Sequence, residues 1–243
     1  MRDPEAVHAR DQRWLALWLA MIAGYVDAYA ILAYGVYVSF MSGNTTQTGS
    51  VIGQEKLLAA VPAALAILFF VVGSAAGTWL TKSGLRQSRH ILFAAIAAVF
   101  AVIIGGAQLG NRALPADLCI SMLGMAMGLM NTTQSHIGGE PMSLTFVTGT
   151  LNRIGTHLAL ALRRAPLPDA QGAWDTHLRR AGLGASVWAS FLTGAIMSAS
   201  ASSHFGVWAL LAPFFGVLAL TLFGSADRDV PTARSQASSR PSM

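Results

Sequence analysis

The chain alternates between long apolar stretches and short segments that carry its charged side chains. Residues 57–80, 91–109 and 183–203 contain no Asp, Glu, Lys or Arg. About 20 apolar residues in a helix span the roughly 30 Å hydrocarbon core of a bilayer, because each residue adds about 1.5 Å. Backbone amides within that core must be satisfied inside the segment, so stretches of this length predict helices. The pattern predicts an all-α membrane protein with six transmembrane helices near 14–38, 57–80, 91–110, 116–136, 183–202 and 206–223.

Composition excludes an ordinary soluble protein. Of the 243 residues, 53% are hydrophobic and 11% are charged, whereas soluble domains average about 25% charged residues. The net charge of +5 does not indicate nucleic acid, because the basic residues flank apolar helices and form no basic patch with interleaved aromatics. We therefore expect the lipid bilayer, and no nucleic acid, as a partner; the oligomeric state is left open.

The distribution of Lys and Arg predicts the orientation in the membrane. Of these 16 residues, 14 lie in the N-terminus, the second-to-third connection, the fourth-to-fifth connection or the tail. Only Lys56 and Arg112 fall on the other side. Cytoplasmic loops carry an excess of Lys and Arg. We therefore expect both chain ends in the cytoplasm of a bacterium, with the helices in its inner (plasma) membrane.

The two halves of the chain carry similar motifs in the same order. Gly24–Ala28 resembles Gly128–Thr132, Phe40–Gly49 resembles Phe146–Gly155, and Phe70–Gly77 resembles Phe191–Ser198. Glycines at these spacings allow helices to approach closely in a membrane. Each half holds three predicted helices, and an odd number makes the second copy enter the membrane from the opposite side. The sequence therefore predicts two inverted three-helix repeats, an architecture that recurs in secondary transporters.

These patterns divide the chain into segments. We expect a cytoplasmic N-terminus over 1–13, a first repeat over 14–110 and a second repeat over 111–224. The second repeat would contain a cytoplasmic linker at 163–182, and residues 225–243, rich in Ser, Ala and Arg, would form a disordered cytoplasmic tail.

The two signatures resemble one known family. The stretch Gly24–Gly49, with Asp27 and Ser42-Gly43-Asn44, and the stretch Gly128–Thr150, with Gly138-Gly139, are similar to the YoaK family of bacterial integral membrane proteins, a family of unknown function. The resemblance covers roughly residues 15–223. The family pattern has Thr where this chain has Ser42, which keeps the hydroxyl group. The resemblance implies a multi-pass inner-membrane protein and implies no substrate or reaction.

Asp27 is the strongest single candidate for function. A carboxylate near the bilayer centre costs about 2.5–3.5 kcal/mol, so such a residue usually faces a partner, a cavity or a pathway. One interpretation is that Asp27 carries a proton; the alternative is a neutral acid that is hydrogen-bonded to a neighbouring helix for packing. Asn131 occupies the matching place in the second half, so we expect the two side chains to face each other.

A run of small polar residues follows the first predicted helix, and we place Ser42, Gly43, Asn44 and Thr45 in the pathway. Gly and Asn permit unwinding, and an unwound turn at membrane depth is tolerated where it lines a cavity or is buried in protein. The alternative is an external loop with helix caps, because Ser and Asn are favoured N-caps.

Residues 145–162 have the period of an amphipathic helix. Thr148 and Asn152 recur on one face beside Gly149 and Arg153, and leucines lie on the opposite face. A re-entrant half-helix would line the pathway with this polar side. A helix lying flat in the interface fits the same pattern, and a spanning helix also stays open.

Sequence motifs for catalysis or cofactor binding are absent. The chain has no Gly-rich phosphate loop, no His-Glu-x-x-His and no Gly-x-Ser-x-Gly. Cys119 is the only cysteine, which excludes an intrachain disulfide and a cysteine metal cluster. We therefore expect no enzyme, no cofactor and no metal.

The leading hypothesis is a secondary transporter or permease for a small polar solute that works by rocking one repeat against the other. Coupling to protons through Asp27 is part of that hypothesis. The alternative is a non-transporting scaffold or regulatory subunit, because Trp174 lies among arginines in the linker and could dock a protein or an anionic lipid.

Overall fold

Among the described residues, the regular structure is helical apart from one short pair of strands. The computed structural model describes residues 4–83, 85, 87–110, 114–133, 136–137, 140–141, 147–168, 170, 172 and 174–223. The elements in chain order are α1 Pro4–Tyr34, α2 Met41–Gly53, η1 Leu57–Ala60, α3 Val61–Lys82, α4 Ser88–Ala107, α5 Ala116–Asn131, β1 His136–Ile137, β2 Glu140–Pro141, α6 Val147–Leu162, α7 His177–Phe205, η3 Gly206–Leu210 and α8 Leu211–Phe223. The two strands are antiparallel.

Several helices have the length and composition of membrane spans. Among the described residues, the stretches long and apolar enough are Arg13–Tyr34, Leu57–Lys82, Ser88–Ala107 and His177–Thr221, and Ala116–Asn131 is a shorter apolar helix. The 45-residue stretch is divided at Gly206, whose φ of +53° ends α7. Both parts of this stretch are helical, as expected from the apolar pattern.

Several predicted helix boundaries differ from the structure. The first helix was expected to reach residue 38 and the fourth residue 136, but α1 ends at Tyr34 and α5 at Asn131. The fifth begins at His177, so the helix takes in residues 177–182 that were assigned to the linker. The hydroxyl groups of Thr132 and Thr133 bond back to the carbonyls of Leu129 and Met130 at 2.7 Å, which closes the end of α5.

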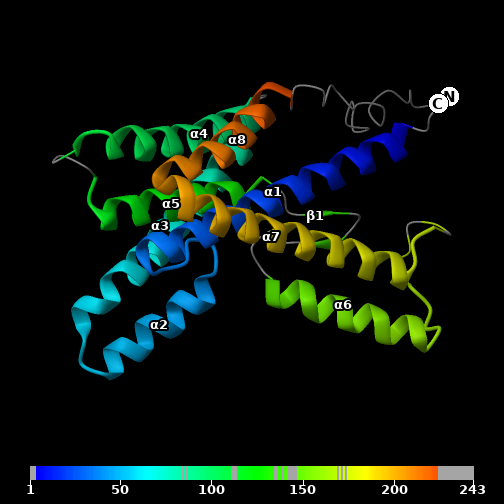
Figure 1. Ribbon diagram of the computed structural model, residues 1–243. Helices are drawn as coiled ribbons and strands as arrows, with labels where there is room; N and C mark the ends of the chain where they lie inside the picture. The colour runs from blue at the N-terminus through cyan, green and yellow to red at the C-terminus, as the bar shows by residue number, and fades with distance from the viewer. Residues whose placement is uncertain are drawn as a thin grey trace, which may run out of the picture.

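α1 and α7 cross at two glycines that leave no room for a side chain. A Cβ atom on Gly24 of α1 would overlap the carbonyl oxygen of Phe191 on α7. A Cβ atom on Gly194 of α7 would overlap the carbonyl oxygen of Met21 on α1. The two backbones are therefore in direct contact, as small residues permit in membrane proteins. Figure 1 shows the two helices running side by side.

α3 and α5 cross in the same way. A Cβ atom on Gly128 of α5 would overlap the carbonyl oxygen of Phe70 on α3, and one on Gly73 of α3 would overlap that of Met125 on α5. Gly128 and Gly73 hold the places in their sequence motifs that Gly24 and Gly194 hold in the other crossing. The recurring motifs thus supply the contacts of both helix pairs.

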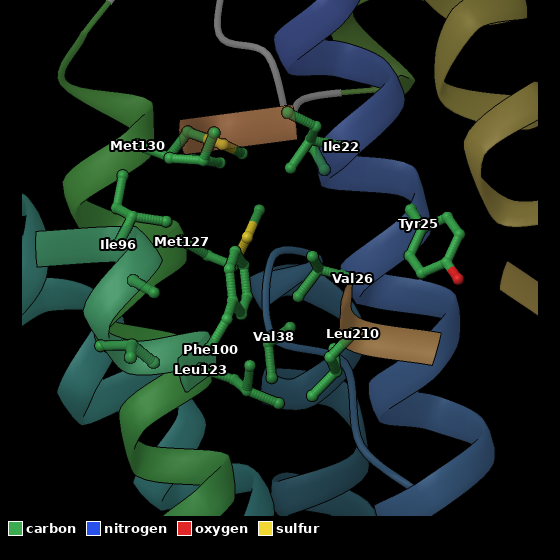
Figure 2. Packing of buried hydrophobic residues seen from close by; sticks show 14 of the residues in the cluster. Ile22, Tyr25, Val26, Val38, Ile96, Phe100, Leu123, Met127, Met130 and Leu210 are labelled. Carbon is green, nitrogen blue, oxygen red and sulfur yellow. The ribbon is translucent and has the colours of Figure 1, made fainter. Parts of the chain in front are cut away.

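The apolar core lies where α1, α4, α5 and η3 meet. α4 contacts both α5 and α8, and its Phe100 is fully buried. Figure 2 shows side chains from these elements and from the α1–α2 connection pointing towards one another, among them Val26, Val38, Phe100, Leu123, Met127 and Leu210. The buried hydroxyl of Tyr25 donates a hydrogen bond to the carbonyl of Ala209 over 2.8 Å, which fastens η3 to α1.

The two short helices each pack against a longer neighbour. α2 lies beside α3, and α6 lies beside α7 (Figure 1). Gly184 of α7 makes room for Ile154 of α6, whose Cγ1 would lie 3.0 Å from an added Cβ. The structure confirms a helix in the predicted 145–162 segment, where α6 covers Val147–Leu162.

Candidate functional site

The chain folds back on itself after α1, and Asp27 holds the returning segment. Gly35 has a φ of +74°, which ends the helix. The backbone N–H groups of Val38 and Ser39 both donate to Oδ1 of Asp27 over 2.8 Å. Asp27 is 5% exposed and precedes the end of α1 by about two turns. The segment after α1 therefore runs back alongside it.

Asn44 of α2 secures the same segment from the other side. Its Oδ1 accepts the N–H of Tyr37 at 3.1 Å, and its Nδ2 donates to the carbonyl of Tyr37 at 2.6 Å. Asn44 is fully buried. Asp27 and Asn44 together satisfy backbone groups that a non-helical segment cannot pair within itself. Such pairing is required wherever irregular backbone is buried away from water.

Both interpretations of residues 42–49, an unwound turn or an external loop, are wrong. These residues lie within α2, which runs from Met41 to Gly53. The hydroxyl of Thr45 donates to the carbonyl of Met41 at 2.8 Å, and that of Thr46 to the carbonyl of Ser42 at 3.0 Å, so these two side chains are satisfied by the helix itself. The irregular backbone lies earlier, at 35–40.

The first-half candidates therefore separate into two groups. Asp27 and Asn44 are buried and share the 37–39 segment, whereas Ser42 and Thr45 are exposed on α2. Gly43 is half-buried, and a Cβ on it would overlap the ring of Phe40. The first group supports the irregular backbone, while the second faces away from it.

The second-half candidates lie on α5 and α6. Asn131 is the half-buried last residue of α5; its expected position opposite Asp27 stays a prediction. On α6, Thr148 and Asn152 are exposed and Gly149 and Arg153 are half-buried. The exposed polar row is thus separate from the face of α6 that meets α7.

Sequence reasoning missed two residues of that contact face. Thr150 is buried and occupies the place in α6 that Asn44 occupies in α2, and the recurring Phe40–Gly49 motif was the signal that could have found it. Nδ1 of His157 lies 3.0 Å from Nδ1 of His177 on α7. No sequence pattern predicted this contact between His157 and His177, because His177 belongs to a different helix.

A separate pocket lies between the N-terminal parts of α1 and α7. It has a volume of about 600 Å³, and its lining includes Arg13, Trp14, Trp174, Arg179 and Arg180. None of the predicted pathway residues lines it. The sequence indicated Trp174 and its neighbouring arginines as a candidate docking site, but it did not predict their contact with α1.

The chain matches a family model described as "Protein of unknown function (DUF1275)" over residues 15–223. It is also similar to the UPF0700 transmembrane protein RA0705 of Rhizobium meliloti (strain 1021), with 29% identity over 205 residues that cover 84% of this chain and 81% of the relative. No solved structure matches the chain. The apolar helices and the transmembrane relative together identify a membrane protein.

Proposed function

This chain belongs to the DUF1275 family of proteins of unknown function, the YoaK-like membrane family that its motifs indicated, and we propose that it is a secondary transporter or permease. It would move a small polar solute across the bacterial inner membrane, with a proton carried by Asp27 as the driving ion. The proposal assigns no chemical reaction and no cofactor to the chain.

The pair of matched glycine crossings carries this proposal. α1 meets α7 through Gly24 and Gly194, and α3 meets α5 through Gly128 and Gly73. α5 is the counterpart of α1 in the second half, and α7 is the counterpart of α3. Each crossing therefore becomes the other when the two halves are exchanged, as expected for a two-fold repeat. With α1, α3, α4, α5, α7 and α8 as spans, each half has three, so the repeat would be inverted, with both chain ends in the cytoplasm.

The short helices fit the half-helices of such transporters. Val38 and Ser39 reach back to Asp27, so α2 would begin within the membrane and run outward from there. α6 holds the matching place in the second half and packs on α7 as α2 packs on α3. Broken helices near the midplane form the substrate sites of many secondary transporters.

The crossings also indicate which helices would move together. α1 has much more extensive contact with α7 than with α5, and α3 is joined most extensively to α5. The rocking of one repeat against the other, expected from the sequence, is therefore revised. We propose one moving body of α1, α6 and α7 and another of α2, α3 and α5, each with helices from both halves.

Asp27 would couple a proton to this movement through the 35–40 segment. That segment connects α1, in one body, to α2, in the other. As a carboxylate, Asp27 accepts both N–H groups strongly, because an ionised acceptor makes a stronger hydrogen bond than a neutral one. Protonation would weaken the two bonds and loosen the connection between the bodies.

Transport in proteoliposomes tests the proposal. Vesicles containing the full chain are offered a mixture of small polar metabolites, with and without a pH gradient, and the internal solutes are measured by mass spectrometry. We expect at least one solute to accumulate when the gradient is present. Failure to move any solute under either condition would overturn the transporter assignment.

The Asp27→Asn variant then tests the coupling. It should abolish pH-driven accumulation while leaving solute exchange at least partly intact. Asp117→Asn, which makes the same change at an exposed position of α5, serves as the control. Uphill transport that survives Asp27→Asn would make Asp27 a packing residue.

The alternative function, a scaffold or regulatory subunit, is favoured by one observation. The arginine- and tryptophan-lined pocket at the start of α7 lies apart from every predicted pathway residue. Trp174→Ala with Arg179→Ala distinguishes the two functions, because a transporter should keep its solute exchange and a scaffold should lose its binding partner.

A further inference from the structure

The pocket between α1 and α7 concentrates positive charge at one end of two membrane helices. Arg13 begins the apolar stretch of α1, and His177 begins that of α7. Three arginines and one acidic residue, Asp175, are among the residues that line the pocket. At about 600 Å³, its volume falls in the range of about 300–1,000 Å³ that holds small ligands.

One of the three arginines is already neutralised. Arg180 donates to Asp175 through Nε at 3.1 Å and through Nη2 at 2.8 Å. The two side chains are 7% and 4% exposed, so the pair is part of the pocket wall. The positive charge left in the pocket therefore belongs to Arg13 and Arg179.

The remaining two guanidinium groups carry like charges in one pocket, and one of them is held in place by an aromatic ring. The Arg179 guanidinium lies 3.9 Å from the centre of the Trp174 ring, a cation–π contact that fixes its position. Arg13 and Arg179 carry like charges that repel each other, while Asp175 attracts Arg179. Nε of Arg13 is buried and donates to no acceptor in the described part of the chain. An anion between the two arginines would offset their repulsion and accept the hydrogen bond that Nε of Arg13 can donate.

Phosphate is the anion that this geometry fits best. A guanidinium group offers several N–H donors in a planar fork that matches two phosphate oxygens. Beside Trp174, Gly172 adopts a φ of +140° and its carbonyl accepts the N–H of Asp175 at 3.0 Å, which places Asp175 next to the ring.

The surroundings indicate that the phosphate belongs to a lipid. Trp14 and Trp174 are 67% and 51% exposed beside the pocket, and exposed tryptophans at the ends of membrane helices lie at the headgroup level. Leu17 and Leu183 add apolar lining, which suits the glycerol and acyl region. We propose that this pocket binds the phosphate of an anionic phospholipid through Arg13 and Arg179.

Native mass spectrometry of the full chain in detergent tests this site. Phosphatidylglycerol and phosphatidylcholine are titrated in parallel, and inorganic phosphate is added as a separate competitor. We expect preferential binding of phosphatidylglycerol. Each arginine near an anionic lipid contributes about a fivefold change in affinity, so Arg13→Gln with Arg179→Gln should weaken phosphatidylglycerol binding roughly 25-fold and leave phosphatidylcholine binding unchanged.

The chain offers a matched control. Arg163→Gln with Arg164→Gln removes the same charge from two exposed residues outside the pocket, and should change the affinity less than about twofold. Arg13→Lys with Arg179→Lys keeps the charge and should lose less affinity than the Gln pair. This variant shows whether a loss in the Gln pair comes from the missing charge or from misfolding. Equal affinity for the two lipids, or equal loss in the control, would overturn the site. If inorganic phosphate bound through Arg13 and Arg179 and the two lipids bound equally, the pocket would be a site for free phosphate and not for a lipid.

Discussion

The backbone N–H of Ser39 donates to the carboxylate of Asp27 over 2.8 Å, although the two residues are 12 positions apart and α1 ends between them. This bond shows that the chain reverses direction after α1. A polar residue inside an apolar helix thus has a structural task, because it satisfies backbone that helix geometry no longer satisfies.

Two substitutions at Asp27 separate its task as an acceptor from its charge. Asp27→Asn keeps an acceptor oxygen for Val38 and Ser39, whereas Asp27→Ala leaves two buried N–H groups unpaired. An unsatisfied buried group costs about 1–3 kcal/mol, so the Ala variant should be destabilised by roughly 2–6 kcal/mol and the Asn variant much less. Thermal unfolding of the detergent-solubilised protein measures this difference. Equal stability of the two variants would mean that the bonds to Asp27 do not hold the segment.

Asn44→Ala should be destabilising for a related reason. The substitution removes the partners of both the N–H and the carbonyl of Tyr37, with an expected loss of about 2–6 kcal/mol. Thr45→Ala on the adjacent exposed position should change stability by less than about 0.5 kcal/mol. The same unfolding assay compares them. A loss at Thr45 as large as that at Asn44 would contradict the assignment.

The sequence predicted the helices well and their interruptions poorly. The apolar residues after Gly35 continue the hydrophobic run, so the first helix was extended to residue 38. What stops α1 is a positive φ at Gly35 together with the hydrogen bonds that the N–H groups of Val38 and Ser39 donate to Asp27. A tertiary hydrogen bond of this kind leaves no periodic signal in the sequence. The polar run at 42–49 was interpreted as an unwound turn or an external loop, because polar residues interrupt the apolar pattern there. The hydroxyls of Thr45 and Thr46 bond to carbonyls of their own helix, which makes a polar sequence compatible with a regular helix.

The glycine motifs were visible in the sequence, but their partners were not. The spacing of Phe70 and Gly73, repeated at Phe191 and Gly194, predicted close helix contact. Nothing in either motif specifies that α3 meets α5 and α7 meets α1. The pocket at Arg13 was hidden for the same reason, because it forms only when the starts of α1 and α7 lie side by side.

Cysteine labelling tests the proposed orientation. In a background where Cys119 is replaced by Ala, a membrane-impermeant thiol reagent should label a cysteine at Gln54 or Arg112 from outside the cell. Positions Arg86 and Arg179 should be protected until the membrane is opened. The expectation follows from the excess of Lys and Arg on the cytoplasmic side. External labelling at Arg86 would reverse the orientation and remove the support for an inverted repeat.

Single glycine substitutions test each crossing. Gly24→Ala and Gly128→Ala place a Cβ against a backbone carbonyl, so the helices must separate. Overpacking of this kind costs about 1–3 kcal/mol or more. Gly105→Ala is the control, because nothing lies within 4 Å of an added Cβ there, and the higher helix propensity of Ala should stabilise that variant by up to about 1 kcal/mol.

Double substitutions then test whether the two crossings belong to separate bodies. Gly24 and Gly194 share the α1–α7 contact, so once the first substitution has separated the helices, the second should cost less than it does alone. Gly24 and Gly128 lie in different crossings, and their effects should add within about 0.5 kcal/mol, as those of independent sites do. Thermal unfolding of the single and double variants gives both coupling energies. If Gly24 and Gly128 were coupled as strongly as Gly24 and Gly194, the two helix pairs would respond as one unit. The proposed movement of one body against the other would then lose its structural basis.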